Sequence, residues 1–134
     1  MRFKSIIGQN SVKQRLIQSV RENRISHALL FAGPEGSGNL ALSIAYAQYI
    51  SCQNKSAEDS CGECGACIKF NKLIHPDLHF SFPAVTKKSG EKPKSTDFMV
   101  TWREALSGNA YLSLRHWLML LDAENEQGNI SVEE

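Results

Sequence analysis

The sequence predicts an α/β fold in which helices cover both faces of a parallel sheet, giving three layers. The apolar run at residues 28–32 has no polar alternation, which is typical of a strand buried on both faces of a parallel sheet. A glycine-rich loop, GPEGSGNL, follows at residues 33–40, and residues 41–50 are strong helix formers. A strand, a glycine-rich loop and a helix in this order indicate a phosphate-binding loop at the start of the helix.

The loop departs from the phosphate-binding pattern at its last two positions. Gly33 and Gly38 match the glycines of G-x-x-x-x-G-K-[ST], but Asn39 replaces the lysine and Leu40 replaces the serine or threonine. Asn39 carries no charge for the phosphates, and Leu40 has no oxygen to ligate Mg²⁺. We therefore expect a loop without ATPase activity and leave ATP binding open, the alternative being a turn that never bound a nucleotide. The candidate residues are Gly33, Pro34, Glu35, Gly36, Ser37, Gly38, Asn39 and Leu40.

Composition narrows the class of protein. The chain has 134 residues, is 42% hydrophobic and 22% charged, and carries a formal net charge of +1. Such a chain is long enough for one globular domain, and its charge gives no general argument for binding nucleic acid or membranes. No apolar run approaches the roughly 20 residues of a membrane span, and residues 1–8 lack a secretion signal, so we expect a cytoplasmic protein.

The four cysteines form one cluster with the spacing C-x8-C-x2-C-x2-C. In a reducing compartment this pattern favours a metal site over disulfides, and four thiolates suit a closed, structural Zn²⁺ site. A pair of disulfides or an iron–sulfur cluster fits less well, because nothing else in the chain indicates secretion or redox chemistry. His75 is a less favoured ligand, since four thiolates already complete the zinc shell. The predicted ligands are Cys52, Cys61, Cys64 and Cys67.

Further elements are predicted on either side of this cluster. A helix is expected from Ser11, with Gln14 completing a capping box. Alternating apolar residues at 78–82 predict a strand, and the lysine-rich stretch 86–97 predicts an exposed, flexible polar loop. That loop is interpreted either as a solvated excursion or as a contact with a DNA backbone.

The end of the chain offers two interpretations. Four apolar residues followed by an acid, at 118–122, resemble the strand that holds Mg²⁺ in nucleotide-hydrolysing enzymes. Leu114 and Trp117 extend the apolar set at helical spacing, and Ser113 stands where a helix cap is expected. The pattern therefore favours a helix.

Several of these motifs together resemble one family. IIGQ at residues 6–9, RISHALLFAGPEGSG at 24–38, the four cysteines and HPD at 75–77 are similar to the AAA+ clamp-loader subunits of bacterial DNA polymerase III. The resemblance covers most of residues 1–83. In the family, the gamma/tau subunit keeps the lysine and threonine after the glycines, whereas the delta-prime subunit commonly has a damaged loop. Asn39 and Leu40 therefore indicate the delta-prime type.

The resemblance implies a fold and a role. Residues 1–134 would be the N-terminal part of a truncated AAA+ P-loop domain, with a zinc module at 52–75 and an unpaired sheet edge through which copies self-associate. The chain would be a non-hydrolysing subunit within the polymerase III holoenzyme. It would assemble with gamma/tau and delta and help to load the sliding clamp onto primed DNA. The alternatives are an ATP-hydrolysing gamma/tau-type motor and a zinc-dependent DNA-binding module.

Overall fold

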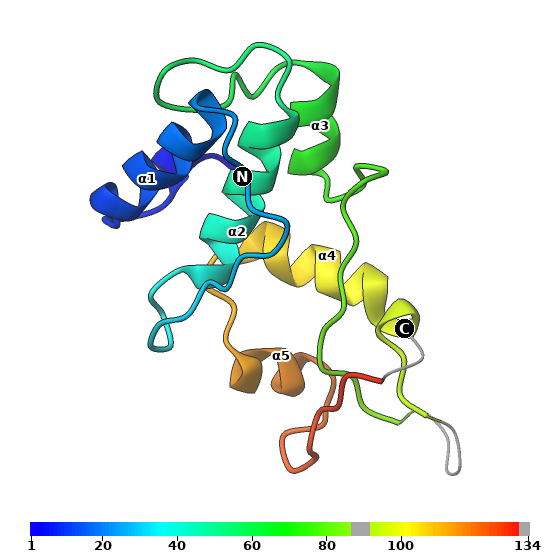
Figure 1. Ribbon diagram of the computed structural model, residues 1–134. Helices are drawn as coiled ribbons and strands as arrows, with labels where there is room; N and C mark the ends of the chain where they lie inside the picture. The colour runs from blue at the N-terminus through cyan, green and yellow to red at the C-terminus, as the bar shows by residue number, and fades with distance from the viewer. Residues whose placement is uncertain (87–91, 132–134) are drawn as a thin grey trace. The chain divides into compact units, whose positions relative to one another are not determined.

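Helices make up the regular structure of the chain in the computed structural model (Figure 1), which describes residues 1–86 and 92–131. The chain divides into two compact units, Met1–Leu78 and His79–Glu134. Each unit has its own buried residues and is described by itself.

Helix α2, Asn39–Ser51, is the centre of the first unit. The short 3₁₀ helix η1 (Phe3–Ser5), α1 (Asn10–Arg21) and α3 (Gly65–Asn71) all contact it. A helix that is apolar on nearly every side has to be buried, and small alanines let its neighbours approach closely. Its buried residues are Ala41, Leu42, Ile44, Ala45, Tyr46, Gln48 and Tyr49.

The starts of the two long helices in this unit test the predicted boundaries. The helix expected after the glycine-rich loop is confirmed, because α2 begins directly after Gly38, whose φ of 83° is left-handed. Helix α1 begins at Asn10 after a left-handed Gln9, and no side chain caps it. The predicted capping box at Ser11 is therefore wrong, because that serine lies inside the first turn instead of before it.

In the second unit, aromatic rings form the core between the segment at residues 80–83 and two helices, α4 (Met99–Gly108) and α5 (Leu114–Leu120). The ring of Phe82 stacks on Trp102, with centroids 4.2 Å apart and planes 11° apart, and meets the edge of Trp117 at 5.2 Å. The indole N–H of Trp117 donates a 2.7 Å hydrogen bond to the carbonyl of Pro83. These contacts attach the segment at residues 80–83 to both helices.

Helix α5 decides between the two interpretations of the chain's end. Residues 118–120 of the segment that resembled a metal-holding strand belong to α5, Leu114–Leu120, and Leu121 and Asp122 form a turn after it, so the helical prediction is confirmed. Ser113 caps this helix as predicted, because its hydroxyl accepts a 3.1 Å hydrogen bond from the amide of His116.

The predicted parallel sheet is wrong. Residues 1–86 and 92–131 contain no β-strand, and their only bridge is an isolated antiparallel pair, Ala84 with Asn129. Residues 28–32 have no regular structure, and Leu29 and Leu30 are 48% and 90% exposed. A parallel strand needs neighbours to accept and donate its backbone hydrogen bonds, and no described segment pairs with this one. The sheet edge proposed for self-association is therefore absent from the described residues as well.

The other predicted strand and the polar loop also differ from the structure. Residues 78–82 form no strand, and the rings of Phe80 and Phe82 both pack on Trp102 instead of facing a sheet. Part of the predicted loop 86–97, residues 87–91, lies outside the described residues. A second 3₁₀ helix, η2 (Ser95–Phe98), begins before the predicted end of that loop, and Ser95 is buried.

Candidate metal centre and phosphate-binding loop

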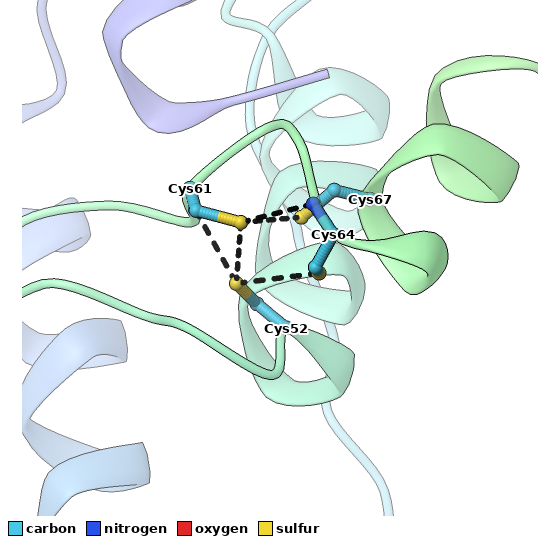
Figure 2. Close-up of side chains that lie close together, drawn as sticks. All are labelled: Cys52, Cys61, Cys64 and Cys67. Atoms are coloured by element: carbon cyan, nitrogen blue, oxygen red, sulfur yellow. Dashed lines mark hydrogen bonds between the residues drawn. The ribbon is translucent and has the colours of Figure 1, made fainter.

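The four cysteines come together at the junction of α2 and α3 in the first unit (Figure 2). Cys52 immediately follows the last residue of α2, and Cys67 lies in the first turn of α3. Cys61 and Cys64 lie in the segment that connects the two helices. The chain thus brings each sulfur to the site from a place that is fixed by a helix end or by a tight turn.

The spacing of the sulfur atoms matches a tetrahedral metal site. A Zn–S bond of about 2.3 Å places neighbouring sulfurs of a tetrahedron about 3.8 Å apart. The Sγ of Cys61 lies 3.6 Å from that of Cys52 and 3.9 Å from that of Cys67, and the sulfurs of Cys52 and Cys64 are 4.0 Å apart. All four sulfurs lie within 4.8 Å of one another. These separations are those of free thiols around a common centre, since a disulfide bond would bring two sulfurs to about 2.05 Å.

Backbone amides are directed at the sulfur atoms. The N–H groups of Glu63 and Cys64 both donate to the Sγ of Cys61, at 3.4 and 3.3 Å, and the N–H of Cys61 donates to the Sγ of Cys52 at 3.3 Å. The turn that makes this possible needs the left-handed Gly62, whose φ is 83°. Hydrogen bonds from a second shell of groups hold metal ligands in place and stabilise their charged form.

The four thiols differ in how readily they ionise. Backbone hydrogen bonds lower the pKa of Cys61 and lower that of Cys64 to about 6. Burial has the opposite effect, since it raises the pKa of Cys52 and raises that of Cys67 to about 12. The two candidate ligands in the turn thus ionise more readily than the two buried ones, whose protons a bound cation would have to replace. This donor set fits zinc, a soft-ligand metal that a closed four-thiolate shell holds for structure and not for catalysis.

His75 lies outside the cysteine cluster. Its ring packs against Phe70, with centroids 4.5 Å apart, and its Nδ1 accepts a hydrogen bond from the amide of Asp77. The preference for four thiolates without this histidine agrees with its position.

The glycine-rich loop folds back on itself in front of α2. The side-chain N–H of Asn39 donates to the carbonyl of Gly33 at 3.3 Å, and the hydroxyl of Ser37 donates to the Oδ1 of Asn39 at 2.9 Å. A Cβ on Gly33 would lie 2.7 Å from the Ser37 hydroxyl and 3.0 Å from that same Oδ1. The side chain that replaces the usual lysine therefore closes the loop from within, whereas Pro34 and Glu35 are exposed.

Residues that surround the cysteines were not identified from the sequence. Arg2 and Gln48 contact the cluster or its immediate neighbours, yet Arg2 is 59 residues from the cysteine whose carbonyl it contacts. Gln48 lies on α2 one turn before Cys52, and a buried glutamine on a largely apolar helix is the one signal that pointed to a polar partner.

No described helix is both long and apolar enough to cross a membrane.

Comparisons with known proteins identify the family of the chain. The family described as "DNA polymerase III, delta subunit" matches residues 8–127. Among curated relatives, the delta-prime subunit of DNA polymerase III from Escherichia coli is 29% identical over 110 residues, which are 82% of this chain and 32% of that protein. The delta-prime subunit from Bacillus subtilis is 36% identical over 75 residues, 56% of this chain and 22% of that protein.

A tau subunit is similar as well. The tau subunit of DNA polymerase III from Bacillus subtilis is 32% identical over 66 residues, 49% of this chain and 12% of that protein. The chain therefore spans a third or less of the length of these relatives. No solved structure matches the chain. Because the family match covers most of its length, the chain belongs to the DNA polymerase III delta-subunit family.

Proposed function

We propose that this chain is part of a clamp-loader subunit of the delta-prime type, which holds the assembly together without hydrolysing ATP. The proposal rests on membership of the family and on one observation in the glycine-rich loop. Asn39 is turned back onto the carbonyl of Gly33, in the space from which a lysine would extend toward the phosphates. Leu40 follows it with no oxygen for Mg²⁺.

The loop is closed by hydrogen bonds from its own side chains. Ser37 contacts both the carbonyl of Pro34 and the Oδ1 of Asn39, so its hydroxyl is already engaged within the loop. A nucleotide would have to displace these bonds and would gain no cation in return. This supports a loop that keeps the turn of a phosphate-binding loop but lacks the lysine and the hydroxyl that would bind phosphate and Mg²⁺.

We further propose that Cys52, Cys61, Cys64 and Cys67 hold a structural Zn²⁺. The sulfur spacing, the amides directed at Cys61 and the two buried thiols support this ligand set. When bound, the ion supplies a rigid link between the end of α2 and the start of α3. It has no open coordination position for a substrate.

The proposed partners follow from the family. Other clamp-loader subunits, of the gamma/tau and delta types, are the direct partners. The sliding clamp and primed DNA are reached through the assembly. Residues 1–134 correspond in this proposal to the N-terminal part of the subunit, with the zinc module at residues 52–75.

Calorimetry with ATP and Mg²⁺ tests the loop. The native chain is compared with a double variant, Asn39→Lys with Leu40→Thr, which restores the missing cation and hydroxyl. We expect no heat of binding for the native chain and binding by the double variant. Tight binding and hydrolysis of ATP by the native chain would contradict the proposal and favour an ATP-hydrolysing motor of the gamma/tau type.

A further inference from the structure

The side chain of Arg2 lies over the turn that carries two of the cysteines. Its Nη1 donates a 3.3 Å hydrogen bond to the carbonyl of Cys61. A Cβ placed on Gly62 would lie 3.0, 3.1 and 3.2 Å from the Nη1, Cζ and Nε atoms of this arginine. Three guanidinium atoms at nearly equal distances mean that the planar group lies flat against the glycine, where any other residue would displace it.

The backbone beside Arg2 is held in place independently of the cysteines. The carboxylate of Asp59 accepts hydrogen bonds from the amides of Phe3 and Lys4, at 3.1 and 2.9 Å. The ring of Phe3 is buried and packs against Tyr49 of α2, with centroids 5.7 Å apart. The position of the guanidinium is thus fixed from the side of η1 as well as from the side of the turn.

A second positive group, the α-ammonium of Met1, lies near the buried Cys67. The α-ammonium of Met1 donates to the Oε1 of Gln48 at 2.8 Å and to the Oδ1 of Asn71 at 2.9 Å. Burial lowers the pKa of this ammonium, and the neighbouring Cys67 opposes only part of that shift. Gln48 is fully buried, and its amide N–H donates to the hydroxyl of Ser60 at 3.1 Å, next to Cys61 in the chain.

The proposed metal site would carry a negative charge, which these positive groups could compensate. One Zn²⁺ with four thiolates carries a net charge of 2−, and a partly buried charge of this size has to be compensated by nearby cations or hydrogen bonds. We propose that Arg2 is a positioning residue for the metal, which compensates the charge of the tetrathiolate and fixes the Cys61–Cys64 turn. This inference rests on the zinc site proposed above. A lysine would keep the charge but not the flat contact with Gly62.

A competition assay with a chromophoric zinc chelator tests the inference. Any affinity tag is placed at the C-terminal side, so that Met1 and Arg2 remain as they are. The native chain is compared with Arg2→Gln, Arg2→Lys and Lys4→Gln. The last of these is the matched control, because it removes one positive charge two residues away, where the exposed side chain is not part of the cysteine turn.

We expect Arg2→Gln to bind Zn²⁺ about tenfold more weakly than the native chain, a typical effect of removing a residue that holds the metal ligands in place. Arg2→Lys should recover part of this loss, and Lys4→Gln should match the native chain. The difference between native chain and Arg2→Gln should shrink at about 1 M salt, which a merely structural contact would not show. The absorption spectrum of the Co²⁺ form establishes that each variant keeps four sulfur ligands.

Two results would overturn the inference while leaving the zinc site in place. One is an unchanged affinity in Arg2→Gln, and the other is an equal loss in Arg2→Gln and Lys4→Gln. Failure of the native chain to bind Zn²⁺ at all would instead refute the proposed metal site, and the role of Arg2 with it.

Discussion

If the four cysteines hold zinc as proposed, its removal should unfold α3 and leave the second unit folded. Helix α3 has only 7 residues, and a helix of that length does not form alone in water. Cys64 immediately precedes this helix and Cys67 lies in its first turn, so the metal would hold its start. Without the ion, the segment loses the link that fixes it to α2.

The size of the expected change follows from the helix lengths. Helices α1, α2, α4 and α5 have 12, 13, 10 and 7 residues. Loss of the 7-residue α3 should therefore remove about one seventh of the helical signal at 222 nm in circular dichroism. Both tryptophans lie in the second unit, so their fluorescence reports on that unit alone and should stay the same.

The assay compares zinc-loaded and chelator-treated chain, with Cys61→Ser as a genetic version of the same change. Hydrogen exchange then locates the effect, which we expect across residues 52–75 with continued protection of α4 and α5. An unchanged circular dichroism signal would refute the idea that the metal holds α3. Loss of most of the helical signal together with a shift in tryptophan emission would show that the metal maintains the whole chain and not one module.

Three other predictions concern the aromatic core, the cysteine turn and acid. Phe82→Ala should lower the free energy of unfolding of the second unit by about 3–4 kcal/mol, because a fully buried ring is lost between two indoles. Phe80→Ala, the matched change at a less buried ring, should cost about 1 kcal/mol in the same urea titration followed by tryptophan fluorescence, and equal costs would contradict the packing described. Gly62→Ala should weaken zinc binding in the chelator assay because φ is 83° and Arg2 occupies the space of the new methyl group. Gly65→Ala, where a Cβ meets nothing within 4 Å, should leave zinc binding unchanged. Zinc affinity should fall by about a hundredfold for each pH unit of acidification near neutrality. Burial raises the pKa values of Cys52 and Cys67, and both of their protons must leave when the metal binds. An affinity that does not change between pH 8 and pH 6 would contradict this.

The local features were predicted well from the sequence. The cysteine cluster, the helix after the glycine-rich loop and the helix at Leu114–Leu120 follow from spacing and periodicity, which act over a few residues. Features that depend on distant partners were predicted less well. Residues 28–32 have the composition of a buried strand, but a strand exists only where a neighbour pairs with it, and composition does not supply that neighbour.

The candidate site shows the same division between near and distant contacts. The four candidate ligands are recognisable because cysteine has few other uses in such a pattern. Arg2 was not predicted, because its contact with Cys61 spans 59 residues and an arginine near a chain start has no distinctive pattern. The fold-back of Asn39 onto Gly33 was not predicted either. The sequence indicated only that a lysine was missing, whereas the structure shows what its replacement contacts.

The hydrogen bonds from Phe3 and Lys4 to Asp59 have a consequence for the order in which the chain folds during synthesis. These bonds join residues that are 56 and 55 positions apart, whereas Cys52 and Cys64 are 12 positions apart. Closing the longer loop costs about 1 kcal/mol more in chain entropy, and it must also wait until Asp59 has left the ribosome. Because Cys61, Cys64 and Cys67 follow Asp59 in the chain, Phe3 and Lys4 can reach its carboxylate before these three sulfur atoms have emerged to bind metal.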